Sequence, residues 1–307
     1  MRVVFMGSRE FAVPTLRVLA ERHEVVGVVT QPDRPAGRGK RKSASEVKQV
    51  AIRLGLRVFE PVSLRAAQSI EPLASLTPDL IVVAAYGQIL PQSVLDLPAL
   101  GCLNVHASLL PRWRGASPVQ AAILHGDPET GVSIMLMEAG LDTGPILAQR
   151  ATPIAARETA GTLSTRLAQI GADLLVEVLP AYQAGGLSPV AQEESLATKA
   201  PRIKKSDGRI DLNHPAAELA RQILAYEPWP GSYLQWDGRR LLIRAARAVA
   251  TAQASPGQVF ELDQRLAIGT GEGALVLEQV QPEGKRSMDG QSFLHGWPSF
   301  MRAQLLG

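Results

Sequence analysis

The sequence predicts an α/β fold with a doubly wound, mostly parallel Rossmann-like sheet, followed by a small β-barrel domain. In the first part, short apolar runs typical of buried strands alternate with amphipathic stretches typical of helices. From about residue 206, short apolar runs follow one another around turn signals such as Asp237-Gly238. We therefore expect one domain at residues 1–189, a linker at 190–205 and the β-barrel domain at 206–307.

The individual elements follow from local patterns. The run from Ser43 to Glu46 matches a capping box, so a helix should begin there and reach about Leu54. Pro180 should kink or end the long helix that begins near Thr162. The other expected elements are strands at 2–7, 24–30, 57–59, 80–85, 102–106, 232–236, 240–245, 258–262, 266–269 and 274–280 and helices at 10–22 and 63–76. In a doubly wound sheet, ligands bind beyond the carboxyl ends of the strands.

The composition is that of a globular protein with a sizeable core. Of 307 residues, 46% are hydrophobic, and the formal net charge of +3 says little by itself about a polyanionic partner. The single cysteine, Cys102, excludes an internal disulfide and fits a reducing compartment. We find no signal peptide and no apolar run of membrane-spanning length, so we expect a cytoplasmic protein. The turn after Gly7 lacks a Gly-x-Gly-x-x-Gly fingerprint, which argues against a nicotinamide cofactor.

Most of the polar groups that could take part in catalysis lie between residues 101 and 147. Asn104 and His106 are two apart on a short apolar run, so on a strand their side chains point to the same side. Asp142 lies between two glycines, where the backbone can turn sharply and approach a ligand. An amide, an imidazole and a carboxylate suffice for acyl-group transfer without a covalent enzyme intermediate.

Each of these residues also has an ordinary structural interpretation. A single histidine on an apolar strand is more often a satisfied core residue, and an aspartate in a glycine-rich loop usually stabilises the turn. Asn104 beside His106 favours a functional site, because burying two polar side chains on one strand is costly without dedicated partners. Cys102 is the alternative nucleophile of a thiol enzyme, but no positioned base is evident, and we interpret it as core. No Cys and His cluster has metal-ligand spacing.

Three ordered motifs carry a resemblance to a known family. They are Asn104-Val105-His106, the run SLLPRWRGASP and the run GLDTGPIL. The chain resembles the formyltransferases that use 10-formyltetrahydrofolate, and specifically those that act on methionyl-tRNA. The resemblance implies a catalytic set of Asn104, His106 and Asp142 and an OB-like second domain. It also implies a folate site lined by Ser108, Leu109, Leu110 and Pro111, with Ile89 and Leu90 in a segment that resembles the wall of the pterin pocket.

A basic segment at residues 31–42 carries five strong bases against one acid. A charge run is usually a solvated surface, but this one resembles the tRNA-contacting insertion of the family, and clustered bases attract phosphates. With little apolar content, the segment is expected to be mobile until tRNA binds. The resemblance implies tRNA contacts at Arg38, Lys40, Arg41, Lys42, Lys204 and Lys205. Leu212 and Leu224 stand where relatives commonly carry Trp and Arg, which weakens a tRNA role for those two positions.

The resemblance implies transfer of a formyl group from 10-formyltetrahydrofolate, a donor substrate, to the amino group of initiator methionyl-tRNA. Asn104 and protonated His106 would hold the oxyanion, while Asp142 would orient His106 and assist proton transfer; no metal and no membrane are implied. The alternatives are a formyltransferase for another amine, such as glycinamide ribonucleotide or an amino-sugar nucleotide, and a non-catalytic RNA-binding protein.

Overall fold

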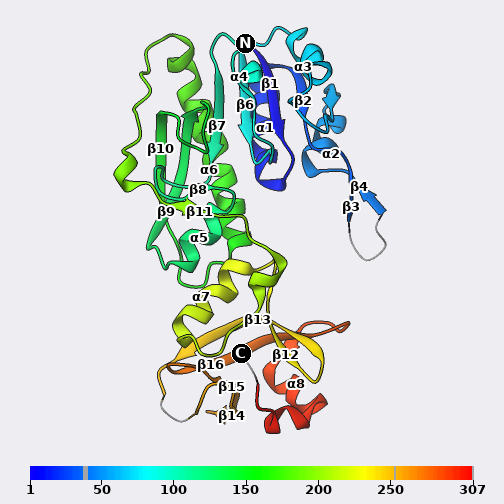
Figure 1. Cartoon of the computed structure of the whole chain (residues 1–307), viewed down its shortest axis with the longest axis vertical. Helices are drawn as coiled ribbons and strands as arrows, with labels where there is room; N and C mark the ends of the chain where they lie inside the picture. Colours follow the sequence, from blue (N-terminus) through cyan, green and yellow to red (C-terminus); the bar gives the residue numbers. More distant parts are fainter. Residues whose placement is uncertain (37–40, 252–253, 306–307) are drawn as a thin grey trace. The chain divides into compact units, whose positions relative to one another are not determined.

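The chain forms two compact units in the computed structural model, which describes residues 1–36, 41–251 and 254–305. The first unit comprises residues 1–118, 129–153 and 164–201, and the second comprises 119–128, 154–163 and 202–307. The first contains a large, mostly parallel sheet with helices, and the second an antiparallel sheet (Figure 1). The predicted fold class is therefore confirmed.

The first unit is built on a seven-stranded sheet with the order β10-β9-β7-β6-β1-β2-β5. Its strands are β1 (Arg2–Gly7), β2 (Glu24–Val29), β5 (Val58–Phe59), β6 (Leu80–Ala84), β7 (Cys102–His106), β9 (Glu129–Leu136) and β10 (Ile146–Pro153). The pairs within β5-β2-β1-β6-β7 are parallel, whereas β9 is antiparallel to both β7 and β10. The strand order reverses between β1 and β6, which is where a doubly wound sheet opens a crevice for ligands.

The helices of this part of the chain are α1 (Val13–Arg22), α2 (Glu46–Arg53), α3 (Ala67–Ala74), α4 (Gln92–Leu95), α5 (Pro118–Leu124) and α6 (Ala160–Gln183). Four of these helices, α1, α2, α3 and α6, lie where the sequence pattern placed them but differ at their ends, whereas α4 and α5 were not expected. The N-cap of α2 is Ser45, not Ser43, because Ser43 pairs with Arg34 in a strand while the Ser45 hydroxyl accepts a hydrogen bond from the Lys48 amide at 3.0 Å. The long helix α6 continues past Pro180 to Gln183, so Pro180 does not end it.

The basic segment has a regular stem. Strand β3 (Arg34–Ala36) pairs antiparallel with β4 (Arg41–Ser43), and Figure 1 shows both strands extending away from the helices of the first unit. The stem has regular backbone structure despite its low apolar content, because a backbone ladder needs no apolar side chains. The expected mobility of the segment stays a prediction. The predicted tRNA contacts Arg38 and Lys40 lie outside the described residues.

A buried apolar cluster supports the strand ends of the first unit. Val4 and Met6 of β1 and Ile81 and Val83 of β6 belong to it, and each is at most 5% exposed. Complete burial of such a side chain contributes about 1.5–3 kcal/mol. The cluster therefore gives the ends of β1 and β6 a rigid support. The described helices, taken over all three ranges, fall short of the length or apolarity needed to span a bilayer.

The second unit has a six-stranded antiparallel sheet with the order β12-β13-β16-β15-β14 and with β17 beside β16. Its strands are β12 (Ser232–Trp236), β13 (Arg239–Val249), β14 (Val259–Leu262), β15 (Arg265–Gly269), β16 (Ala274–Pro282) and β17 (Met288–Asp289). The five strands expected from the sequence are all present, and the Asp237-Gly238 turn joins β12 to β13 as expected. Two helices, α7 (Ala216–Tyr226) and α8 (Gly290–Gly296), were not expected.

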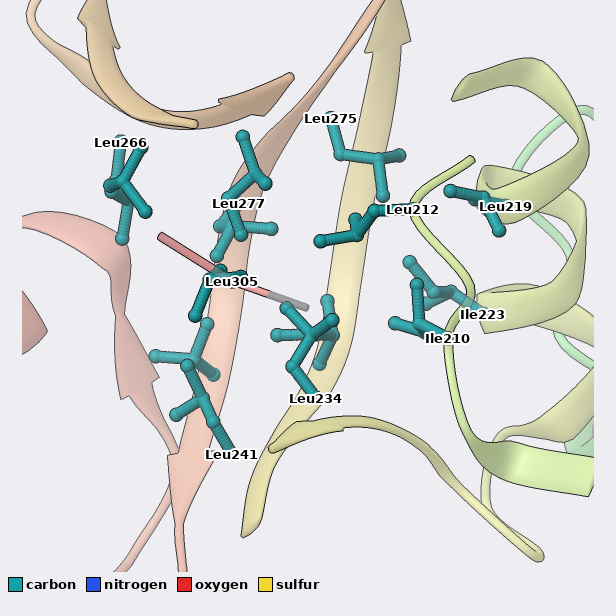
Figure 2. Close-up of a cluster of buried hydrophobic side chains, with 14 of the residues drawn as sticks. Ile210, Leu212, Leu219, Ile223, Leu234, Leu241, Leu266, Leu275, Leu277 and Leu305 are labelled. Atoms are coloured by element: carbon teal, nitrogen blue, oxygen red, sulfur yellow. The ribbon is translucent and has the colours of Figure 1, made fainter. Parts of the chain in front are cut away.

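Leucine and isoleucine side chains fill the centre of the second unit. Figure 2 shows Leu219 and Ile223, one turn apart on α7, facing the strand side chains Leu234 and Leu275. Leu212 lies in the same cluster and is 1% exposed. Leucine at this position therefore serves the core and has no surface for a nucleic acid to contact.

Candidate active site

Asn104 and His106 lie together at the carboxyl end of β7. This strand pairs with β6 on one side and β9 on the other, so it occupies the interior of the sheet. The alternation of side chains along a strand puts both residues on the same face, as expected. Asn104 is 9% exposed and His106 is 6% exposed, so both polar groups are buried and need partners.

Asp142 reaches these two residues from the loop between β9 and β10. Its carboxylate accepts hydrogen bonds from the Gly115 amide at 2.8 Å and, more weakly, from Asn104 Nδ2 at 3.4 Å. The Asp142 backbone has a φ of 54°, in the left-handed region that L residues rarely adopt. At Gly144 a Cβ atom would collide with the Leu136 carbonyl oxygen, so the glycine is required there.

The His106 ring has a different partner on each nitrogen. Nε2 lies 3.0 Å from the Trp113 carbonyl oxygen, and Nδ1 lies 3.8 Å from Asp142 Oδ2. Because a carbonyl oxygen can only accept, Nε2 carries a hydrogen and donates a hydrogen bond to the Trp113 carbonyl oxygen. Nδ1 is then the nitrogen that can exchange a proton beside Asp142. The hydrogen bond to Trp113 fixes the orientation of the ring, a role that the sequence assigned to Asp142 alone.

The loop after β7 is held by two polar side chains that the sequence interpretation missed. The Ser133 hydroxyl on β9 donates to the Ser108 carbonyl at 2.6 Å and accepts from the Leu110 amide at 3.0 Å. Gln149 Nε2 on β10 donates to the Leu110 carbonyl at 2.9 Å and to the Ser133 hydroxyl at 2.8 Å. The strands expected from the sequence include neither β9 nor β10, so no local pattern marked these two positions.

The predicted folate residues occupy two loops at the carboxyl ends of β6 and β7. Ile89 is 77% exposed, so its side chain is available to a ligand. Leu90, Ser108 and Leu110 are buried, and the Ser108 hydroxyl donates to the Arg112 carbonyl at 2.6 Å. The side chains of Leu109 and Pro111 are half-buried. Ser108 therefore shapes its loop through its side chain.

The predicted tRNA residues lie in both units. Arg41 and Lys42 belong to β4 in the first unit. Lys204 and Lys205 are exposed in the second unit, at the start of a short 3-10 helix (Lys205–Gly208). Arg38 and Lys40 are in the part of the chain that is not described.

Cys102 is a core residue. It is buried, and burial together with the charge of Asp96 raises the pKa of its thiol to about 12. A thiol with such a pKa is almost entirely protonated at neutral pH and is a poor nucleophile. This contradicts the alternative of a thiol enzyme. Within the described ranges, no three His, Cys, Asp or Glu side chains gather in a way that would hold a metal ion.

Comparison with known proteins agrees with this geometry. Residues 1–179 match the family model of the formyl transferases, and residues 202–298 match the model of the formyl transferase C-terminal domain. Methionyl-tRNA formyltransferase of Roseiflexus castenholzii is 49% identical over 96% of both chains. The protein of the same name from Methylococcus capsulatus is 48% identical over 96% of both chains.

Solved structures share the fold. The N-formyltransferase of Helicobacter canadensis, solved with folinic acid and dTDP-3-aminofucose, superposes with a TM-score of 0.66 at 17% identity over 92% of this chain and 99% of that one. HypX of Aquifex aeolicus, solved with tetrahydrofolic acid, gives a TM-score of 0.64 at 19% identity; 98% of this chain matches 48% of that one, so this chain spans about half of HypX. On the sequence matches over nearly its whole length, the chain belongs to the formyl transferase family, among the methionyl-tRNA formyltransferases.

Proposed function

We propose that this chain transfers the formyl group of 10-formyltetrahydrofolate to the free amino group of initiator methionyl-tRNA, giving N-formylmethionyl-tRNA for translation initiation. One observation carries the proposal: an amide, an imidazole and a carboxylate converge at the carboxyl end of β7, where a doubly wound sheet receives its ligands. Relatives that share 46–49% of their residues with this chain bear the name of this activity.

The three side chains divide the reaction between them. As the amine attacks the formyl carbon, the formyl oxygen becomes an oxyanion, which Asn104 Nδ2 and a protonated His106 Nδ1 stabilise as hydrogen-bond donors. A preorganised donor of this kind lowers the barrier by about 2.7–4 kcal/mol. The amine loses a proton, the bond from the formyl carbon to the folate nitrogen breaks, and that nitrogen gains a proton. The Asp142 carboxylate accepts the first proton and passes it on.

The backbone contacts make this division possible. The Gly115 amide holds one carboxylate oxygen of Asp142, and the Trp113 carbonyl holds Nε2 of His106. His106 and Asp142 therefore each keep one polar atom for the substrates while another atom is fixed. Fixed donors and acceptors avoid reorganisation during the reaction, which is the source of their catalytic effect.

The remaining assignments belong to the same proposal. The catalytic domain covers residues 1–189, the linker 190–205 and the C-terminal domain 206–307, and the protein acts in the cytoplasm, where initiator tRNA is used. The folate site is formed by Ile89, Leu90, Ser108, Leu109, Leu110 and Pro111. The tRNA phosphates are contacted by Arg38, Lys40, Arg41, Lys42, Lys204 and Lys205, because clustered bases release counterions from a polyanion.

One substrate comparison tests the proposal. The purified protein is incubated with 10-formyltetrahydrofolate and, in separate reactions, methionyl-tRNA, glycinamide ribonucleotide or an amino-sugar nucleotide, and the acceptor is weighed by mass spectrometry. We expect a formyl group on the methionine of methionyl-tRNA and none on the other two amines. Formylation of either small acceptor in preference to the tRNA overturns the proposal. Binding of the tRNA without any formylated product would identify the chain as an RNA-binding protein.

A further inference from the structure

The segment at residues 190–200, here named the strap, contacts the two loops that carry the active site. Val190 exchanges two backbone hydrogen bonds with Ile146, which follows the Asp142 loop, each at 2.8 Å. At its other end, strand β11 (Lys199–Ala200) pairs in parallel with β8 (Arg114–Gly115), part of the loop that follows His106. The strap therefore joins two loops that the sequence places about thirty residues apart.

Gln192 in the strap bridges these loops through a single amide group. Its Nε2 donates to the Asp142 carbonyl at 2.9 Å and to the Gly144 carbonyl at 2.6 Å. Its Oε1 accepts a hydrogen bond from Arg114 Nε at 3.0 Å. Arg114 is 6% exposed and also pairs with Glu194 of the strap at 2.7 Å. A half-buried amide that satisfies two carbonyls and a buried guanidinium is costly to remove.

Thr198 holds the loop on the histidine side. Its hydroxyl accepts a hydrogen bond from the Trp113 amide at 2.9 Å, and its carbonyl accepts one from the Arg114 amide at 2.9 Å. Trp113 is the residue whose carbonyl orients His106. The strap contact and the catalytic contact are therefore on the same residue.

The strap contacts the active site at two residues whose own backbone is strained. Asp142 has a φ of 54° and Trp113 a φ of 62°, the left-handed region in which a residue other than glycine costs about 1–3 kcal/mol unless its surroundings hold it. Gln192 bonds to the carbonyl of Asp142, and Thr198 bonds to the amide of Trp113. Hydrogen bonds from polar side chains to these two residues are not expected of a linker that only crosses the surface.

We propose that Gln192 and Thr198 are positioning residues of the active site, which fix the left-handed backbone at Asp142 and Trp113 and thereby the distance between the Asp142 carboxylate and His106. The inference rests on the proposed function, because it concerns the groups that carry the transfer. A displacement of about 1 Å at such groups can lower turnover about 100-fold.

The variant Gln192→Glu tests the contribution of the Nε2 hydrogen-bond donor of Gln192. The glutamate keeps the length of the side chain and the acceptor for Arg114 but replaces Nε2 with an oxygen that repels the Asp142 and Gly144 carbonyls. We expect kcat for methionyl-tRNA formylation to fall about 10- to 100-fold, while KM for 10-formyltetrahydrofolate changes less than about threefold. The matched control is Glu193→Gln, an exposed neighbour whose carboxylate accepts from Ser195, and it should leave kcat unchanged.

Thr198 supplies a second pair of variants. Thr198→Val keeps the shape and removes the hydroxyl acceptor, and we expect kcat to fall about 5- to 30-fold. Thr198→Ser restores the hydroxyl and should recover most of the lost activity. Recovery by the serine separates the hydrogen bond to Trp113 from packing of the threonine methyl group.

Amide hydrogen exchange separates positioning from general stability. In Gln192→Glu and Thr198→Val, exchange should rise at residues 112–116 and 140–146, while exchange in the rest of the sheet stays as in the wild type. Wild-type kcat in both variants, or faster exchange throughout the first unit, overturns the inference. If the wild-type protein itself formylates no methionyl-tRNA, the proposed function fails, yet the exchange experiment still decides whether the strap fixes these loops.

Discussion

The polar cluster at the end of β7 in the first unit contrasts with the apolar core of the second unit. In the first unit, the end of β7 gathers Asn104, His106 and Asp142, and each of these polar groups is held by a hydrogen bond or by an ionic contact. In the second unit, the sheet and α7 enclose leucine, isoleucine and phenylalanine side chains. A substitution in the polar cluster should therefore change chemistry at nearly constant stability, whereas one in the apolar cluster should change stability and leave the chemistry intact.

Asp142→Asn should produce the largest loss of turnover. The asparagine oxygen can still accept from the Gly115 amide, so the shape of the loop is kept, but the side chain no longer accepts a proton. We expect kcat to fall about 100- to 10,000-fold, the range for removal of a general acid–base group. The measurement is turnover with saturating substrates beside the thermal midpoint. A variant that melts early with its specific activity preserved would make Asp142 a structural residue.

Asn104→Ala should have the next largest effect. Removal of one oxyanion donor costs about 2.7–4 kcal/mol of barrier, so kcat should fall about 100- to 1,000-fold while folate affinity is retained. His106→Ala should behave in the same way. The control is Asn213→Ala, which alters an exposed asparagine of the second unit and should leave turnover unchanged. Near-normal turnover in both site variants would falsify the assignment of donors.

Leu275→Ala tests the apolar side of the comparison. Leu275 is completely buried in the second unit, and its truncation should destabilise that unit by about 2–5 kcal/mol. Hydrogen exchange of the β13 and β16 amides reports this loss, because Leu275 lies on β16 and pairs with Ala248 of β13. Turnover of the molecules that remain folded should stay within about twofold. Leu54→Ala, at a leucine that is 44% exposed, should change stability by less than about 0.5 kcal/mol.

The elements that the sequence predicted well are those with a local signal. Strand β7 was predicted at its observed bounds because the apolar run ends at a glycine on one side and a serine on the other, and β12 because Asp237-Gly238 fixes the hairpin. Helices α7 and α8 are short segments that precede β12 and follow β17, and α7 becomes stable only through packing on the sheet. A β-barrel was expected in this region from the sequence, and these helices were therefore not predicted.

The side chains of the candidate site could be predicted from the sequence, but the residues that hold them in position could not. Asn104, His106 and Asp142 stand in recognisable motifs, whereas Thr198 binds Trp113 across 85 positions of the chain and Gln192 binds Asp142 across 50. Such pairs leave no local pattern. The contact of the Trp113 carbonyl with His106 could not be predicted from the sequence either, because it depends on the backbone conformation of Trp113 and not on its indole side chain.

Arg38→Ala should have a smaller effect that depends on salt. Each lost phosphate contact should lower the slope of log affinity against log salt by about 0.7–0.9, so methionyl-tRNA should bind more weakly at low salt and with a flatter dependence. Folate affinity should not change, because the folate site is proposed in other loops. Arg65→Ala, at an exposed arginine outside the basic segment, is the control. Identical slopes for wild type and Arg38→Ala would make the basic segment an ordinary solvated surface.

The smallest effect is expected at Cys102, which lies on the same strand as the two proposed oxyanion donors but in the apolar core. Burial raises the pKa of its thiol to about 12, above the ordinary value near 9. Below pH 9 the thiol is protonated in both the folded and unfolded chain, so it adds no pH dependence. Between about pH 9 and 12 only the unfolded chain ionises, and stability falls as pH rises.

Cys102→Ala should therefore keep turnover within about twofold and remove this part of the alkaline loss of stability. The measurement is the free energy of unfolding from pH 7 to pH 11 for wild type and variant, together with the rate at which iodoacetamide modifies the wild-type thiol at pH 8. We expect modification only as fast as the first unit opens, because the thiolate is scarce and the sulfur is covered. Rapid modification with parallel loss of turnover would instead assign Cys102 to the active site and remove the contrast between the polar cluster and the apolar core.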